Sequence, residues 1–149
     1  MLTFLNLEAE GFCSIESLHL QLNPTCTILI KAPNGKGKST ILSALVWAIY
    51  GKNLKGVSEV NTWKQVRPKD YKGTKVQVYF QKDSHTYKIV RCQKYDEVLE
   101  DGAKGKDRLI FMKDGDIVDI KGKGKIQDFI NREIGLSYTL FMNSILFGQ

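Results

Sequence analysis

The sequence of 149 residues contains few of the side chains that build metal centres and disulfide frameworks. It has three cysteines and two histidines, and no pair of cysteines stands in a Cys-x-x-Cys spacing. A thiolate metal site and a disulfide scaffold are therefore disfavoured, and free thiols are typical of a reducing cytoplasm. The residues concerned are Cys13, Cys26, Cys92, His19 and His85.

Long apolar runs are also missing from the sequence. No stretch approaches the roughly 20 consecutive apolar residues that a transmembrane helix requires. The N-terminus lacks the basic segment and apolar core of a secretory signal peptide. We therefore expect a soluble protein of the cytoplasm with no membrane partner.

Acidic residues are outnumbered by basic ones. The chain carries 22 Lys and Arg against 16 Asp and Glu, which gives a formal net charge of +6. A basic excess favours an anionic partner, and both nucleotides and nucleic acids meet that description. The length suits one domain with a real hydrophobic core.

The most informative stretch is residues 32–40, with the sequence Ala-Pro-Asn-Gly-Lys-Gly-Lys-Ser-Thr. The apolar, β-branched run 26–30 before it predicts a buried strand, and residues 41–50 after it predict a buried helix. A strand, a glycine-rich loop and a helix in this order are typical of the phosphate loop G-x-x-x-x-G-K-[ST]. Ala32 replaces the first glycine, and we interpret it as a tolerated variant.

The chemistry of nucleotide binding explains this spacing. Gly35 and Gly37 lack a Cβ, so their backbone N–H groups can approach phosphate oxygens closely. The start of the helix adds free N–H groups and the positive end of its dipole. Lys38 is predicted to reach the β- and γ-phosphates, and the Ser39 hydroxyl to bind Mg²⁺. The predicted ATP-binding residues are Asn34, Gly35, Lys36, Gly37, Lys38, Ser39 and Thr40. The alternative is a lysine-rich turn before an ordinary buried helix.

Two strands are predicted near the N-terminus, over residues 2–9 and 17–22. Leu18, Leu20 and Leu22 alternate with polar residues, as in a strand with one buried face. The turn between the strands, residues 11–15, lies close in sequence to the phosphate loop. It could border the base or ribose of a nucleotide, or it could be a plain hairpin turn packed by Phe12.

Residues 52–75 form a long segment without clear periodicity, which predicts a functional or mobile loop. Its basic residues are interleaved with Trp63 and Tyr71, a combination that could contact a phosphate backbone. The alternative is a solvated loop, since charged side chains are mostly exposed.

The second half of the sequence predicts two β-hairpins followed by two helices. The first hairpin joins residues 75–80 to 86–91, and the second joins 108–112 to 116–120 through an Asp-Gly turn. Residues 102–106 and 121–125 read as basic, glycine-rich links, the latter as a flexible linker. A helical face ends at Gly135, and Ser137 can cap a last helix. No strand is followed by a convincing acidic Mg²⁺ ligand, because the Asp-Gly turn already explains the aspartates.

The order of these features resembles a known family. Four features together are similar to the N-terminal half of SMC-like DNA-repair ATPases. They are the phosphate loop with its strand (28–40), the helix ending at residues 48–52, the hairpin at 76–91 and the closing stretch 141–149. The closest similarity is to the SbcC type, which includes recombination-endonuclease subunits of bacteriophages. The resemblance implies an α/β fold of the P-loop NTPase class. It would be the N-terminal lobe of an ABC/SMC-type ATPase head over residues 1–149, with a mixed sheet, β-hairpins and a buried helix after the phosphate loop.

The resemblance also implies function and partners. In this family a Q-loop glutamine touches Mg²⁺ and the attacking water, and the matching position is Gln149. The acidic strand and signature loop lie in a C-terminal half, beyond a coiled coil, so this chain would not hydrolyse ATP alone. Two heads dimerise around ATP on DNA, and hydrolysis gates an SbcD-type nuclease subunit. The alternatives are a chromosome-clamp head, a transporter-type head and a compact P-loop kinase.

Overall fold

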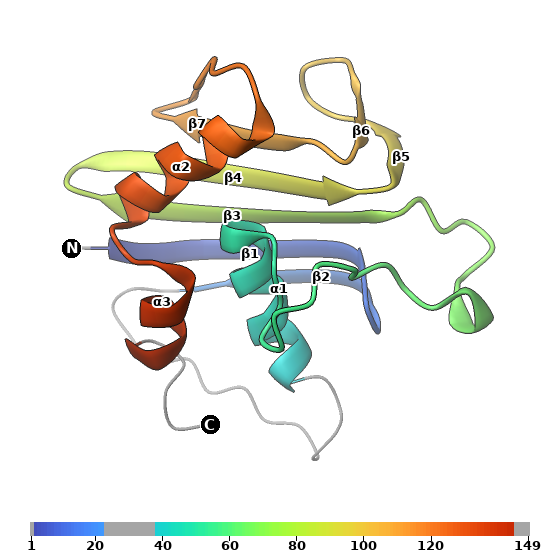
Figure 1. Ribbon diagram of the computed structural model, residues 1–149. Coiled ribbons are helices and arrows are strands. Elements are labelled where there is room, and N and C mark those ends of the chain that lie inside the picture. The colour runs from blue at the N-terminus through green and yellow to red at the C-terminus, as the bar shows by residue number, and fades with distance from the viewer. Residues whose placement is uncertain (1, 23–37, 145–149) are drawn as a thin grey trace.

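The computed structural model describes residues 2–22 and 38–144 (Figure 1). Strands and helices alternate irregularly along this part of the chain, and a short 3-10 helix, Lys64–Val66, lies in the long loop after the first helix. The elements are β1 (Leu2–Phe12), β2 (Ile15–Gln21), α1 (Lys38–Tyr50), β3 (Thr74–Lys82), β4 (His85–Gln93), β5 (Tyr95–Val98), β6 (Lys104–Lys106), β7 (Leu109–Lys113), β8 (Asp116–Ile117), α2 (Lys123–Ile134) and α3 (Tyr138–Ser144).

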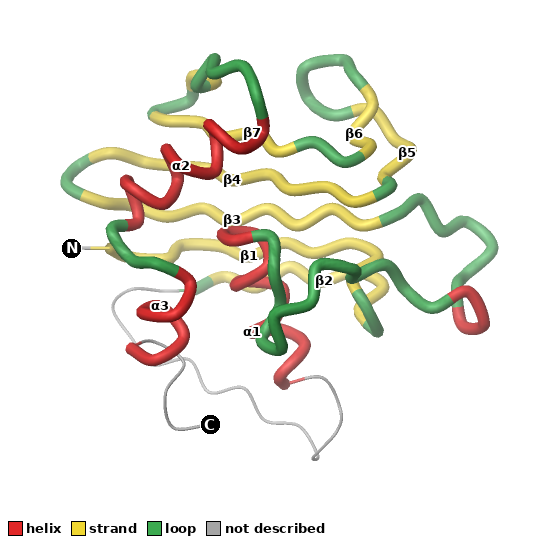
Figure 2. The backbone as a smooth tube through the Cα atoms, in the orientation of Figure 1, coloured by secondary structure: helices red, strands yellow, loops and turns green. Residues whose placement is uncertain are grey.

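One sheet organises the described residues. Its six strands run in the order β2-β1-β3-β4-β7-β8, and the pairings given for them are all antiparallel. The helices α1, α2 and α3 lie on one face of this sheet, and β5 and β6 form a separate two-stranded arm at one end (Figures 1 and 2). The strand predicted at residues 26–30 lies outside the described residues.

The predicted hairpins are confirmed. In β3 and β4, apolar side chains alternate toward the helices, and the two strands pair from Thr74–Gln93 to Lys82–His85. Asp83 and Ser84 turn the chain with φ values of 51° and 69°, the left-handed conformation that a two-residue hairpin requires. The second hairpin is shorter than predicted, because β8 ends at Ile117.

The core lies between the sheet and the helices. Phe80, Tyr87 and Phe111 come from three adjacent strands and stack face to face, with ring centroids 4.8 Å apart for the first pair and 5.6 Å for Tyr87 and Phe111. Phe141 of α3 is fully buried against the same cluster. Aromatic rings carry large buried areas, so this cluster fixes where α2 and α3 can pack.

Helix α1 matches its prediction closely. It begins at Lys38, and residues 44–49 are buried on every side. Gly51 ends the helix with φ of 77°, and its N–H donates to Trp47 O at 2.7 Å. Apolar residues on every side of this part of the helix are typical of a helix buried in the core.

The predicted helix at 126–134 is confirmed, but the flexible linker before it is wrong. Helix α2 begins at Lys123, so most of the 121–125 segment forms its first turn; the N–H groups of Lys125 and Ile126 both donate to Gly122 O at 3.1 Å. Glycine weakens a helix by about 1 kcal/mol, and here the packing of the buried Ile130 and Ile134 outweighs that cost.

The glycine-rich link at 102–106 is also more ordered than predicted. Strand β6 pairs with β5, and Lys104 Nζ lies 2.7 Å from Asp96 Oδ1 across the pair. Gly105 packs so closely on Tyr95 that a Cβ would lie 2.7 Å from the ring. Three polar residues show no apolar alternation, so sequence pattern could not reveal this strand. Among the described helices, none is long and apolar enough to cross a membrane.

Candidate nucleotide-binding site

The start of α1 is the described part of the predicted phosphate-binding site. Ser39 is exposed and Thr40 is half-buried in the first turn of the helix. The first backbone N–H groups of a helix lack intrahelical partners and favour an anion. The other predicted residues, Asn34, Gly35, Lys36, Gly37 and Gln149, lie outside the described residues, as does the side chain of Lys38.

A cavity of about 540 Å³ adjoins this turn. Ser39, Thr40 and Ser43 form the wall that belongs to α1. The opposite walls come from distant segments, namely the turn between β1 and β2 and the loop after α1. They contribute Cys13, Ser14, Asn53, Leu54, Lys55, Glu59, Asn61, Trp63 and Val66. The volume lies within the range of small-molecule sites, and the lining combines hydroxyl, amide and apolar groups.

The predicted turn at 11–15 therefore borders the helix that follows the phosphate loop. The turn is narrower than predicted, because β1 extends to Phe12 and β2 begins at Ile15. Phe12 is fully buried and packs on Trp47 of α1, with centroids 5.7 Å apart. Its role as an apolar anchor is confirmed, and the same packing brings Cys13 and Ser14 to the cavity.

The loop after α1 is held against the helix and the sheet by hydrogen bonds. Trp47 Nε1 donates to Ser58 O at 3.2 Å, and Cys13 N donates to Val60 O at 2.8 Å. Val60 N donates to the side-chain oxygen of Gln93 at 2.8 Å. Residues 58–60 are thereby fixed to three separate elements, so this wall of the cavity is preformed.

Asn61 stands at the centre of a buried polar network that sequence reasoning missed. Its Nδ2 donates to Thr74 Oγ1 at 2.8 Å, to Gln93 O at 3.0 Å and to Tyr71 Oη at 3.2 Å. The hydroxyls of Tyr71 and Thr74 both bond Gly11 O, at 2.9 and 2.7 Å. These contacts determine which side of the amide is the nitrogen. Asn61 Oδ1 is left buried without a hydrogen-bond partner among the residues described.

The two aromatic residues of the loop, Tyr71 and Trp63, differ in their relation to this network. Tyr71 has its hydroxyl engaged in the network, and its ring carries Arg67 with the guanidinium carbon 4.7 Å from the centroid. Trp63, in contrast, is 78% exposed. Only the indole is therefore presented as an open surface for a ligand.

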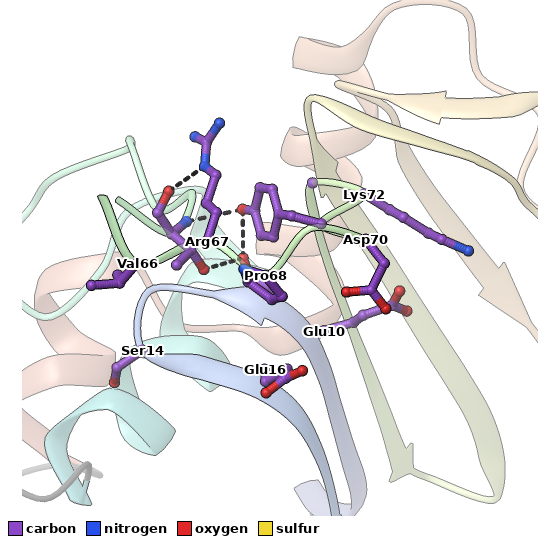
Figure 3. A pocket seen from close by; sticks show the side chains of 12 residues that line it. Glu10, Ser14, Glu16, Val66, Arg67, Pro68, Asp70 and Lys72 are labelled. Carbon is purple, nitrogen blue, oxygen red and sulfur yellow. Dashed lines mark hydrogen bonds between the residues drawn. The ribbon is translucent and has the colours of Figure 1, made fainter. Parts of the chain in front are cut away.

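A second cavity of about 650 Å³ lies beside the first and is shown in Figure 3. Ser14 and Val66 line both cavities. The second one carries three carboxylates, Glu10, Glu16 and Asp70, together with Arg67 and Lys72. Its mixed charge gives no clear preference for an anion.

Arg91 closes the other end of α1. The side chain is 5% exposed, and its guanidinium donates to Ala48 O at 3.0 Å and to Ile49 O at 3.2 Å, and also to Gln127 Oε1. Burial lowers the pKa of Arg91 to about 10. A cation at a helix C-terminus satisfies free carbonyls and opposes the negative end of the dipole. Sequence pattern placed Arg91 in a strand but could not show this contact.

Within the described residues, no group of three or more His, Cys, Asp or Glu side chains could hold a metal ion. Of the residues predicted to bind Mg²⁺, Ser39 lies in the described part of the chain and Gln149 lies outside it.

Comparison with known proteins places the fold. Residues 6–149 match the family model described as the AAA domain. The chain belongs to the AAA domain family. No curated protein matches this chain in sequence. Its fold is that of P-loop ATPases, so the predicted α/β fold class is confirmed.

Solved structures support the same conclusion about fold. The recombination mediator RecF bound to ATP has 19% sequence identity and a TM-score of 0.55 over 84% of this chain. The match with this chain covers only 30% of the RecF chain. A structure from a study of ATP-driven dimerisation and DNA-stimulated activation of SMC ATPases has 21% identity and a TM-score of 0.54, covering 91% of this chain and 81% of the other. At these identities the similarity establishes a shared fold, and this fold agrees with the predicted SMC-like ATPase head.

Proposed function

We propose that this chain, residues 1–149, is the N-terminal half of an SMC-like ATPase head that binds ATP with Mg²⁺. The observation that carries the proposal is the first turn of α1. A helix whose residues 44–49 are buried follows the 32–40 phosphate-loop sequence, and its first turn presents Ser39 and Thr40 to a polar-lined cavity of about 540 Å³. These residues fit a nucleotide, because free helix N–H groups and hydroxyls are the partners that phosphate and Mg²⁺ require.

Each residue has a defined part in this proposal. The N–H groups of residues 34–40 cradle the phosphates, and Lys38 neutralises the charge between the β- and γ-phosphates. Ser39 and Gln149 hold Mg²⁺, and Gln149 positions the attacking water. Bound Mg²⁺ supplies charge neutralisation on the phosphates. The acidic ligand and the signature loop belong to a C-terminal half of the same head, so this chain alone binds ATP weakly and does not turn it over.

The finer assignment is to the SbcC type, possessed by bacteria and bacteriophages. A protein of this type is one subunit of a nuclease complex in the cytoplasm. The complex processes DNA ends in recombination and double-strand-break repair. Two heads close around ATP on DNA, and hydrolysis gates an SbcD-type nuclease. The sequence resemblance supports this proposal, and the continuation of the reading frame discriminates it from a chromosome clamp. Heptads with a central Cys-x-x-Cys favour the repair type, and a hinge domain favours the clamp.

The two basic stretches 52–75 and 102–125 are both candidates for a DNA-facing surface, because each combines paired and unpaired cations. In the first, Lys72 pairs with Glu97 at 3.2 Å, and in the second, Lys121 and Lys125 have no carboxylate partner among the described residues. In the 102–125 stretch, Lys104 pairs with Asp96 at 2.7 Å and Arg108 pairs with Asp101. In the 52–75 stretch, Lys64 and Lys69 have no carboxylate partner among the described residues. Unpaired surface cations are free to replace the counterions of a phosphate backbone.

The test is the Lys38→Ala substitution. The chain offers a matched control, because Gly-Lys-Gly-Lys occurs at residues 35–38 and again at 122–125, where it opens α2. We expect Lys38→Ala to abolish Mg-ATP binding by the 149-residue chain, measured by calorimetry, and Mg-ATP hydrolysis by the full-length protein. Lys125→Ala should leave both unchanged. Unaltered hydrolysis in Lys38→Ala would refute the proposal.

A further inference from the structure

Trp63 is a large apolar side chain placed in water beside the candidate site. It is 78% exposed and lines the 540 Å³ cavity together with the half-buried Leu54 and the exposed Val66. An exposed indole next to other apolar groups is unfavourable unless a ligand or partner covers it. The same cavity reaches Ser39 and Thr40 at the helix N-terminus, so whatever covers Trp63 shares a cavity with the phosphate-binding turn.

The backbone around Trp63 is rigid although its side chain is exposed. Thr62 Oγ1 donates to Cys13 O at 2.7 Å, and Thr62 O accepts from Arg67 Nε at 2.6 Å. Val66 N donates to Trp63 O at 3.0 Å in the 3-10 turn. A flat surface held in advance binds a planar group with little loss of conformational freedom.

Beside the indole, the cavity wall includes Asn61 and Glu59. Asn61 lines the cavity, is 7% exposed, and has a buried Oδ1 with no partner among the described residues. A buried unpaired amide oxygen is costly, and a donor from a ligand or an ordered water would relieve it. The one carboxylate among the described lining residues, Glu59, is paired with Lys94 at 3.3 Å. The cavity therefore offers a stacking surface and no unpaired carboxylate among the described lining residues.

We propose that Trp63 is the stacking platform for the nucleobase of the bound nucleoside triphosphate, and that it selects purines over pyrimidines. The inference rests on the proposed function, because the phosphates must lie at the start of α1. A purine offers a larger ring surface to the indole than a pyrimidine does, so stacking favours ATP over CTP.

The two tryptophans make a direct test possible. Trp47 is only 2% exposed, so a ligand can reach the indole of Trp63 but not that of Trp47. We expect ATP to quench the tryptophan fluorescence of the 149-residue chain and to bind more tightly than CTP. Inorganic tripolyphosphate, which has no base, should bind in calorimetry without quenching the fluorescence.

The variants separate stacking from phosphate binding. Trp63→Ala should weaken ATP binding about tenfold, the scale of one lost base stack, and leave tripolyphosphate binding unchanged. Trp63→Phe should restore most of the affinity. Val98→Ala, at an exposed apolar residue of the β5–β6 arm, is the matched control and should match the wild type.

The outcomes distinguish the two proposals. If neither ATP nor tripolyphosphate binds, the proposed function fails and this inference fails with it. If ATP binds with equal affinity to the wild type and Trp63→Ala, only the inference is overturned. Quenching by single-stranded DNA but not by ATP would also overturn it, and would assign Trp63 to nucleic acid instead.

Discussion

At the scale of single residues, Arg91 is a charged side chain that is buried at the end of α1. Its charge is removed from water, yet the guanidinium satisfies carbonyls at the end of α1 that have no helical partner. It also lies over the Trp47 ring, 6.0 Å from the centroid. Because Phe12 packs on the same ring, Arg91 helps to hold the helix whose opposite end forms the candidate site.

We expect Arg91→Met to destabilise the fold by about 2–4 kcal/mol, because Ala48 O loses the guanidinium donor and Ile49 O keeps only the donor from Gln127, while the apolar volume is largely kept. Urea denaturation measures the change. Arg132→Met, at an exposed position of α2, is the control and should shift stability by less than about 0.5 kcal/mol. Equal effects of the two substitutions would contradict the capping role of Arg91.

At the scale of elements, two features lie at the C-terminal end of α1. One is the local helix-ending residue Gly51, and the other is the contact with Arg91 of the distant strand β4. Gly51 has φ of 77°, and a Cβ there would lie 3.1 Å from Arg91 Nη1. Gly56 has almost the same φ, 75°, but a Cβ there would meet nothing within 4 Å. The two glycines therefore separate backbone strain from crowding.

Gly56→Ala should cost about 1 kcal/mol, the strain of a left-handed alanine. Gly51→Ala should cost more, because it adds the displacement of a buried guanidinium to the same strain. Thermal unfolding of the two variants, compared with the wild type, measures the difference. A smaller loss for Gly51→Ala than for Gly56→Ala would show that the guanidinium yields freely.

At the scale of the whole described structure, the helices cover one face of a sheet. The central strands of this sheet are paired more extensively than those at its margins. Strands β1, β3 and β4 each pair on both sides, whereas β8 pairs through two residues and the β5–β6 arm forms its own small sheet. Local opening is easiest where few buried contacts and few ladder bonds must be broken.

We expect amide hydrogen exchange to be slowest in β3, β4 and α1 and fastest in β8 and the β5–β6 arm. Mass spectrometry of exchanged peptides measures the order. Protection of the arm equal to that of β3 would mean that its polar pairs stabilise it as strongly as core packing stabilises the sheet. In the loop at 58–62, the amides of Val60 and Thr62 should exchange slowly despite the lack of regular structure, because they donate to Gln93 Oε1 and Tyr71 Oη.

The sequence by itself determined the features that depend on neighbouring residues. The bounds of α1 follow from an apolar run that begins after a glycine loop and stops at Gly51, and the β3–β4 hairpin follows from alternation across a polar turn. The hydroxyls of Ser39 and Thr40 at the helix start were likewise predictable from the motif. The predicted roles of residues 34–37 and of Gln149 stay predictions, since these residues lie outside the described part.

Only the tertiary structure decided the features that depend on distant partners. Arg91 meets a carbonyl 43 positions away, and Tyr71 meets Gly11 across 60 positions. No local pattern encodes such pairs, because a buried polar side chain is placed by whatever groups the packing leaves unsatisfied around it. For the same reason the motif could locate the start of α1, but only the folded chain placed Asn61 and Trp63 in the cavity beside it.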